Sequence, residues 1–135
     1  MDASVVVKWA VKEAGRDDSL ALLNAYEARK IGLISPRVLR EEVASALSKR
    51  CRRKLITHPE AEAAFQFLDQ RMPFLVHDAE LAGEALRISL RHHLSFWDGL
   101  YLALAIRYRC DMVTADPRLV RAVRPHYPFV ALLGS

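Results

Sequence analysis

The chain has 135 residues, of which 52% are hydrophobic and 27% are charged, and its formal net charge is +4 at pH 7. This length is sufficient for one domain with a full hydrophobic core, and the composition is that of a soluble globular protein. The longest apolar run, Leu100–Ile106, is far shorter than the roughly 20 residues of a transmembrane helix, so we expect no membrane span.

The sequence carries no sign of secretion. A basic stretch followed by an apolar segment and a small-residue cleavage site is absent from its start. Its two cysteines, Cys51 and Cys110, do not form a C-x-x-C pair. Lone thiols are typical of a reducing compartment, so we expect a cytoplasmic protein.

The hydrophobic pattern predicts helices alternating with short apolar strands. The helices are expected over residues 4–12, 18–29, 36–54, 59–70, 79–92, 96–109 and 117–123, and the strands over 32–35, 74–77, 111–114 and 129–132. This alternation favours a parallel sheet covered by helices on both faces, with ligands bound beyond the carboxyl ends of the strands. No repeat or Pro/Gly-rich linker divides the chain, so we predict a single domain over residues 1–135.

Three aspartates stand at predicted helix starts. Asp98 follows Ser95 by three positions, which is the S-x-x-D pattern of a capping box. Asp116 directly precedes Pro117, and Asp2 precedes an apolar helical segment. Each alone is most simply a helix cap, stabilised by about 0.3–1 kcal/mol through the helix dipole. The helix that contains Asp98 is apolar nearly all the way round, however, and such helices are normally buried.

Glu42 is not explained by capping. It lies on or beside the apolar stripe that includes Leu39 and Val43, whereas Glu41 is turned about 100° away, toward solvent. Glu42 has no basic neighbour on its face, and it lies well inside the helix expected from Pro36. Because an unpaired buried carboxylate is costly, we expect Glu42 to face a ligand.

One explanation would cover all four acids. If Asp2, Glu42, Asp98 and Asp116 converged, they would repel one another and raise each other's pKa values, and only a cation would make the cluster favourable. Carboxylates suit Mg²⁺ or Mn²⁺, whereas Zn²⁺ prefers His or Cys. Mg²⁺ held by a few carboxylates can activate a water and clamp a phosphodiester for in-line displacement.

Four segments resemble, in order and spacing, the motifs of PIN-domain ribonucleases of the VapC toxin type: DASVVVKW, REEVASAL, WDGLYLALA and TADPRL. The resemblance covers essentially the whole chain. It implies an α/β, PIN-like three-layer fold with a central, mostly parallel five-stranded sheet flanked by helices. It assigns Asp2, Glu42, Asp98 and Asp116 to a catalytic quartet that binds Mg²⁺ or Mn²⁺, with Ser4 and Thr114 in supporting hydrogen bonds.

By the same resemblance we expect a Mg²⁺-dependent endoribonuclease that hydrolyses RNA with a metal-activated water. It would be a homodimer and the toxin of a toxin–antitoxin pair, neutralised by a VapB-type antitoxin. Two alternatives stay open: a catalytically silent PIN-like binding or scaffold module, and a metal-dependent DNA nuclease, since the phosphodiester chemistry is the same in both polymers.

Basic residues are concentrated in KRCRRK, residues 49–54. This segment is either a solvated helix end, where cations suit the dipole, or a patch that contacts RNA phosphates. The candidate RNA-binding residues are Arg50, Arg52, Arg53 and Lys54.

Other residues with possible functions have plainer interpretations. Trp9 and Trp97 could stack on bases, but near helix starts in a small domain we expect them to be packing residues. His92 and His93 are adjacent, so a helix would point them about 100° apart, and we expect surface side chains rather than joint metal ligands.

One expected element is missing from the sequence. In the family an apolar strand precedes the first acid and lies in the middle of the sheet, whereas only Met1 precedes Asp2 here. A sheet without its central strand would leave backbone groups of its neighbours unpaired, at about 1–3 kcal/mol for each buried group. We therefore expect the natural protein to begin a few residues upstream, or another segment or chain to fill the gap.

Overall fold

The computed structural model describes residues 1–135, and each helix and strand that the sequence predicts is present. The helices are α1 (Ala3–Val6), η1 (Val7–Trp9, a 3-10 helix), α2 (Arg16–Glu27), α3 (Leu39–Arg52), α4 (His58–Asp69), α5 (Leu81–His92), α6 (Phe96–Tyr108) and α7 (Pro117–Val123). The strands are β1 (Ile34–Pro36), β2 (Phe74–Val76), β3 (Met112–Thr114) and β4 (Val130–Leu132). The fold is α/β with parallel strands, as expected.

The helix predicted from Pro36 begins later than expected. Residues Ile34–Pro36 pair with Phe74–Val76 as a strand, so α3 starts only at Leu39. Glu42 consequently lies in the first turn of α3. The expectation that Glu42 is well inside a helix is therefore wrong.

The strands form two separate parallel pairs rather than one sheet. β1 pairs with β2, and β3 pairs with β4. Between the pairs lie only Met1 and Asp2: the Met1 ammonium donates to the Ile34 carbonyl at 3.3 Å, and the Asp2 amide donates to the Val113 carbonyl at 3.3 Å. Two residues are too few to form a strand. The chain thus has four strands where the family resemblance implies five.

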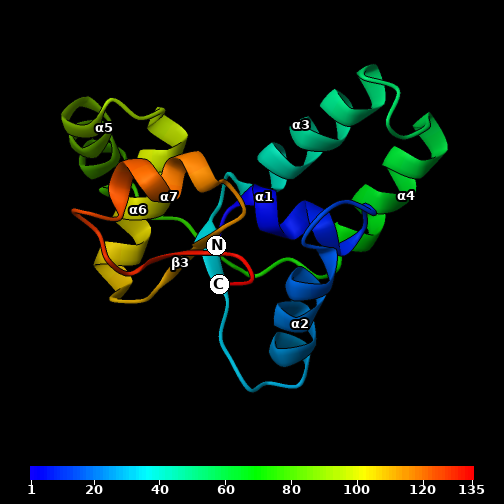
Figure 1. The fold of residues 1–135 in the computed structure, drawn as a ribbon, viewed down its shortest axis with the longest axis horizontal. Coiled ribbons are helices and arrows are strands. Elements are labelled where there is room, and N and C mark those ends of the chain that lie inside the picture. Colours follow the sequence, from blue (N-terminus) through cyan, green and yellow to red (C-terminus); the bar gives the residue numbers. More distant parts are fainter.

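Helices surround these strands on both sides. In Figure 1, α1 lies at the centre, with the α3–α4 hairpin on one side and α5, α6 and α7 on the other. α5 packs along α6, and α3 packs against both α4 and α1. No helix has the length and apolar character needed to cross a bilayer.

The core is centred on the first helical turns. Val5, Val6 and Val7 are completely buried, and Trp9 packs beside them as expected, with its indole N–H donating to the Ser19 carbonyl at 2.9 Å. Trp97 is different, because 49% of it is exposed. The buried part of α6 is its middle, Gly99–Ala105, and Trp97 precedes it. The expectation of a packed Trp97 is therefore wrong.

Candidate active site

The four predicted acids all lie at helix starts. Asp2 is the N-cap of α1, Asp116 is the N-cap of α7 directly after β3, and Asp98 and Glu42 lie in the first turns of α6 and α3. The positive ends of helix dipoles favour negative charge at such positions. The fold therefore presents four carboxylates from four different helices.

Asp2 is held by hydroxyl groups. It is only 7% exposed, and its Oδ1 accepts hydrogen bonds from the Ser4 amide, at 3.1 Å, and from the Ser4 hydroxyl. Ser4 Oγ also accepts from the Ala115 amide at 2.9 Å, and Thr114 Oγ1 accepts from the Asp116 amide at 3.1 Å. The two hydroxyl oxygens lie 3.4 Å apart. Ser4 and Thr114 thus link the start of α1 to the turn that carries Asp116.

Asp98 does not complete the capping box that its spacing from Ser95 predicts. Ser95 Oγ accepts a hydrogen bond from the Asp98 amide at 3.1 Å, but no return bond runs from the Ser95 amide to the Asp98 side chain. Only half of the predicted capping box is therefore formed. Burial raises the pKa of the Asp98 carboxyl, and its hydrogen bond with the Ser95 side chain acts in the opposite direction.

Glu42 has an unsatisfied oxygen. Its Oε1 is buried without a hydrogen-bond partner, whereas Glu41 is exposed, as expected. Burial, together with the charges of Asp2 and Asp98, raises the pKa of Glu42 from 4.5 to about 7. An ionised carboxylate here lacks any compensating donor or cation from the protein.

The acids interact electrostatically with one another. Burial is the main cause that raises the pKa values of Asp2 and Asp98. The charges of Asp2 and Asp116 raise the pKa of Asp98 further. Asp2, Glu42 and Asp98 therefore share one partly desolvated neighbourhood, and Asp116 lies at its edge.

Asp116 differs from the other three acids because its side chain is exposed. Its Oδ1 accepts hydrogen bonds from the amides of Arg118, at 2.8 Å, and Leu119, at 3.4 Å. This is an N-cap, so Asp116 has a structural function whether or not it binds a ligand.

The donor set fits a hard divalent cation, although no three His, Cys, Asp or Glu residues lie close enough to one point to form a metal site as the side chains stand. The fit rests on the unpartnered, buried Oε1 of Glu42 and on the chemistry of the neighbouring acids Asp2 and Asp98, which offer only oxygen atoms. Such ligands suit Mg²⁺ or Mn²⁺.

Tyr101 belongs to this neighbourhood but is not among the site residues that the sequence predicts. It is 3% exposed, and its hydroxyl is buried without a hydrogen-bond partner. Burial raises its pKa, and the charges of Glu42, Asp2 and Asp98 add to the effect. The feature of the sequence that could have identified Tyr101 is its position three residues after Asp98, which puts both residues on one face of the helix.

The basic segment contains one arginine held in an ion pair and three exposed cations, of which Arg52 donates to Ser48 Oγ at 2.8 Å. Arg50 is half-buried and holds both carboxylate oxygens of Glu13, at 2.9 and 3.0 Å, so its guanidinium is already engaged. Arg52, Arg53 and Lys54 are exposed at the end of α3. Ten residues of helix separate Glu42 from Arg52, which corresponds to about 15 Å. An extended polyanion that reaches the acids could therefore also contact this end of α3.

The two adjacent histidines point to different surroundings. His92 Nε2 lies 3.0 Å from the Tyr127 hydroxyl and its ring is near that of His126, whereas His93 is exposed at the end of α5. His93 is the C-cap of α5 with a φ of 54°, so it lies outside the helix and the 100° spacing expected for two helical neighbours does not apply to this pair.

Comparison with known proteins identifies the family. The PIN domain model matches residues 1–125. The chain belongs to the PIN-domain family. It is 33% identical over 128 residues to proteins named Ribonuclease VapC1 from two strains of Mycobacterium tuberculosis, CDC 1551 / Oshkosh and ATCC 25618 / H37Rv, covering 90% of this chain and 92% of each relative. This is a family of nucleases that generally use divalent metals.

Proposed function

We propose that the protein is a metal-dependent endoribonuclease of the VapC type. The observation that carries the proposal is the neighbourhood of Asp2, Glu42 and Asp98, which is partly desolvated and in which no Lys, Arg or His side chain forms an ion pair with the acids, in a chain of the PIN family. Asp2, Glu42, Asp98 and Asp116 would hold Mg²⁺ or Mn²⁺. RNA is the proposed substrate because the relatives are named ribonucleases.

The bound ion would polarise the phosphodiester and lower the pKa of an attacking water. The protein's own contribution is to keep the acids in place. Ser4 orients the Asp2 carboxylate, and Thr114 holds the Asp116 amide. Since the pKa of metal-free Glu42 is about 7, cation binding would be accompanied by loss of a proton from that side chain near neutral pH.

The decisive experiment compares wild type with Asp98→Asn on total cellular RNA in the presence of Mg²⁺, with the cut ends sequenced. We expect the variant to lose at least about 100-fold in cleavage rate, because one of the carboxylates proposed to hold the metal ion is removed. Glu41→Gln is the matched control, since Glu41 is exposed next to Glu42. Equal cleavage by wild type and Asp98→Asn would contradict the proposal.

The same preparations separate the alternatives. Excess Mn²⁺ should raise the Tm of wild type and of Glu41→Gln by mass action, but not that of Asp98→Asn. A metal response without cleavage of RNA or DNA would indicate a silent binding module. Faster cleavage of DNA than of RNA would indicate a DNA nuclease.

The proposal includes a homodimer and a VapB-type antitoxin as the protein partner. We expect the cognate antitoxin to inhibit cleavage and to compete with metal or RNA at the acids. Full nuclease activity in a stable toxin–antitoxin complex would contradict this mode of inhibition.

A further inference from the structure

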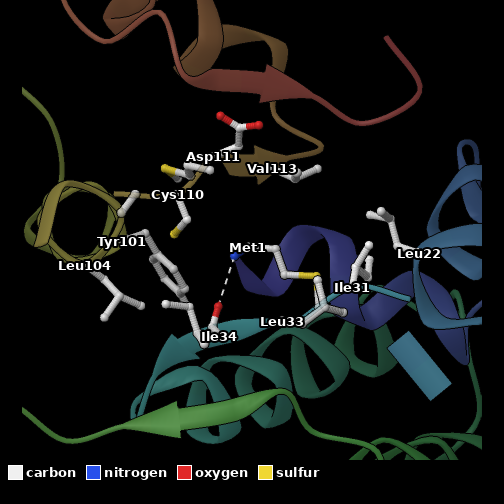
Figure 2. A pocket seen from close by; sticks show the side chains of 13 residues that line it. Met1, Leu22, Ile31, Leu33, Ile34, Tyr101, Leu104, Cys110, Asp111 and Val113 are labelled. Carbon is white, nitrogen blue, oxygen red and sulfur yellow. Dashed lines mark hydrogen bonds between the residues drawn. The ribbon is translucent and has the colours of Figure 1, made fainter. Parts of the chain in front are cut away.

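Two pockets of the protein differ in their chemistry. The cavity in Figure 2, between the two strand pairs, has a volume of about 360 Å³ and is lined mostly by hydrophobic residues. A pocket of about 400 Å³ at the end of α5 is lined by only four residues: Arg91, His92, His126 and Tyr127. A guanidinium, an imidazole and a phenol can each donate hydrogen bonds, and none of the four is a carboxylate. The pocket at the end of α5 therefore has the chemistry of an anion site.

Contacts between these side chains hold the pocket in shape. His92 Nε2 lies 3.0 Å from the Tyr127 hydroxyl, and the centroids of the His92 and His126 rings are 4.7 Å apart. The Tyr127 ring packs in turn against Phe129, at 5.8 Å between centroids. The Val123 carbonyl accepts hydrogen bonds from the amides of His126, at 2.9 Å, and Tyr127, at 2.8 Å. The end of α5 and the turn after α7 are thus joined without a ligand.

The charges around His92 are positive. Desolvation lowers the pKa of His92, and the positive charges of His126, Arg91 and His93 lower it further. Like charges at this spacing repel one another, and an anion bound among them would remove that repulsion. The electrostatics of the pocket therefore agree with its hydrogen-bond donors.

The pocket lies close to the acids along two helices. Ser89, which is three residues and about 4.5 Å of helix before His92, packs against the residue directly after Asp98. On the other side, α7 starts after Asp116 and has seven residues, or about 10 Å of helix, before the turn that carries His126. An RNA strand has a phosphate at every nucleotide, so a strand that reaches the acids can bring another phosphate to this pocket.

We propose that Arg91, His92, His126 and Tyr127 bind a backbone phosphate of the RNA, outside the bond that is cleaved at the acids. This inference rests on the proposed function, because RNA is the substrate proposed there. Donors to a phosphate add affinity and position the strand without reading its sequence. In Figure 1, α5 and α7 lie on the side of α1 opposite α3, so this pocket and the exposed cations of α3 hold the strand on both sides of the acids.

The first test follows the histidine rings by NMR on the Asp98→Asn background, which prevents cleavage. The probe is an unstructured eight-nucleotide RNA. We expect it to shift the Cε1–H resonances of His92 and His126, whereas that of His58, which is exposed on α4, should not move. Inorganic phosphate alone should shift the same two resonances at higher concentration. A response to phosphate without a response to RNA would make the pocket a site for small anions only and would overturn the proposal.

The second test removes donors from the pocket. Arg91 and His126 are both exposed, so the double variant Arg91→Ala/His126→Ala should keep the fold. On the same background we expect it to raise the Kd for RNA about tenfold and to make the slope of log K against log salt shallower by roughly one unit. Arg87→Ala/His58→Ala is the matched control, because it removes the same two types of exposed side chain outside the pocket and should bind as the parent does.

Three results of the second test would contradict the proposal. An unchanged Kd would mean that RNA does not use the pocket, and an equal loss in the control would mean that only the overall charge matters. A higher Kd with an unaltered salt slope would mean that the rings stack on bases instead of binding a phosphate.

The failure of this inference can be told apart from the failure of the proposed function. RNA cleavage by the wild type, together with unchanged RNA binding in Arg91→Ala/His126→Ala, would overturn the phosphate site alone. No cleavage by the wild type, together with the expected shifts and the weaker binding of the pocket variant, would overturn the nuclease and leave the phosphate site in place.

Discussion

The α-carbon of Gly99 faces the carbonyl oxygen of Ala85 so closely that a methyl group on Gly99 would approach this oxygen to 2.6 Å. The contact joins the first turn of α6 to the middle of α5. Asp98 is the residue before Gly99. The close approach of the two helices therefore helps to fix the part of the backbone that carries this acid.

We predict that Gly99→Ala destabilises the protein by about 1–3 kcal/mol, because the added methyl meets backbone rather than a flexible side chain. Gly83→Ala is the matched control on α5. The nearest atom to its added methyl is Arg87 Nη1 at 3.6 Å, which is ordinary contact. The control should be neutral or more stable by about 0.5–1 kcal/mol, since Ala is the better helix former. Urea unfolding of both variants distinguishes the two effects.

The second prediction concerns pH and Glu42 in the metal-free protein. The pKa of Glu42 rises from 4.5 to about 7 on folding, so between these values the folded state holds a proton that the unfolded state has released. The resulting stabilisation is complete below pH 4.5 and is lost as the pH rises through about 7. Glu42→Gln should flatten this dependence and be more stable than wild type by about 1 kcal/mol at pH 7.5, a value reduced because the side chain is only half-buried.

The measurement is the free energy of unfolding in EDTA from pH 4.5 to 8. Glu41→Gln serves as the control and should retain the wild-type dependence, because Glu41 is exposed. The same curve for wild type and Glu42→Gln would show that the unfavourable charge of Glu42 is compensated.

Local patterns were sufficient to predict which helices and strands are present and that three of the acids stand at helix starts. Helix starts carry recognisable residues, so Asp2, Asp98 and Asp116 could be placed at them from sequence, and the apolar stripe of α3 pointed to Glu42. The start of α3 was harder to predict, because Ile34–Pro36 become a strand only by pairing with β2, about 40 residues away.

Contacts between distant segments could not be read from periodicity. Arg50 resembles the other cations of its segment in sequence, yet Glu13 engages it across 37 positions. Nothing in the sequence around Gly99 shows that a glycine is needed there, because the requirement comes from the packing of α5 against it. In the sequence Tyr101 occupies one more apolar position of α6. Its unpartnered hydroxyl becomes part of the site only because acids from other helices approach it in the fold.

The third prediction separates the two roles of Asp116. Asn is also a good N-cap, so Asp116→Asn should leave the stability of the metal-free protein unchanged or slightly raised while it removes nuclease activity. Asp116→Ala removes the acceptor of the Arg118 and Leu119 amides and should cost about 0.5–2 kcal/mol. Thermal unfolding and RNA cleavage are measured on both. Clear destabilisation by Asn would show that the charge itself is needed for the cap, and unchanged activity would remove Asp116 from the quartet.

The last prediction concerns the exposed cations at the end of α3. If Arg52 and Arg53 contact RNA phosphates, replacing both with Ala should weaken RNA binding for all sequences, because phosphate contacts carry no sequence information. The slope of log K against log salt should become shallower by roughly one unit for each lost contact. Binding is titrated at several salt concentrations on the Asp98→Asn background, which prevents cleavage during the measurement.

Arg50→Ala is the control, because Arg50 is held in an ion pair with Glu13. Its removal breaks this ion pair and should lower the stability of the protein more than it changes the salt slope. An unaltered slope in the double variant would make this segment a solvated helix end, with its cations matched to the dipole of α3 rather than to RNA.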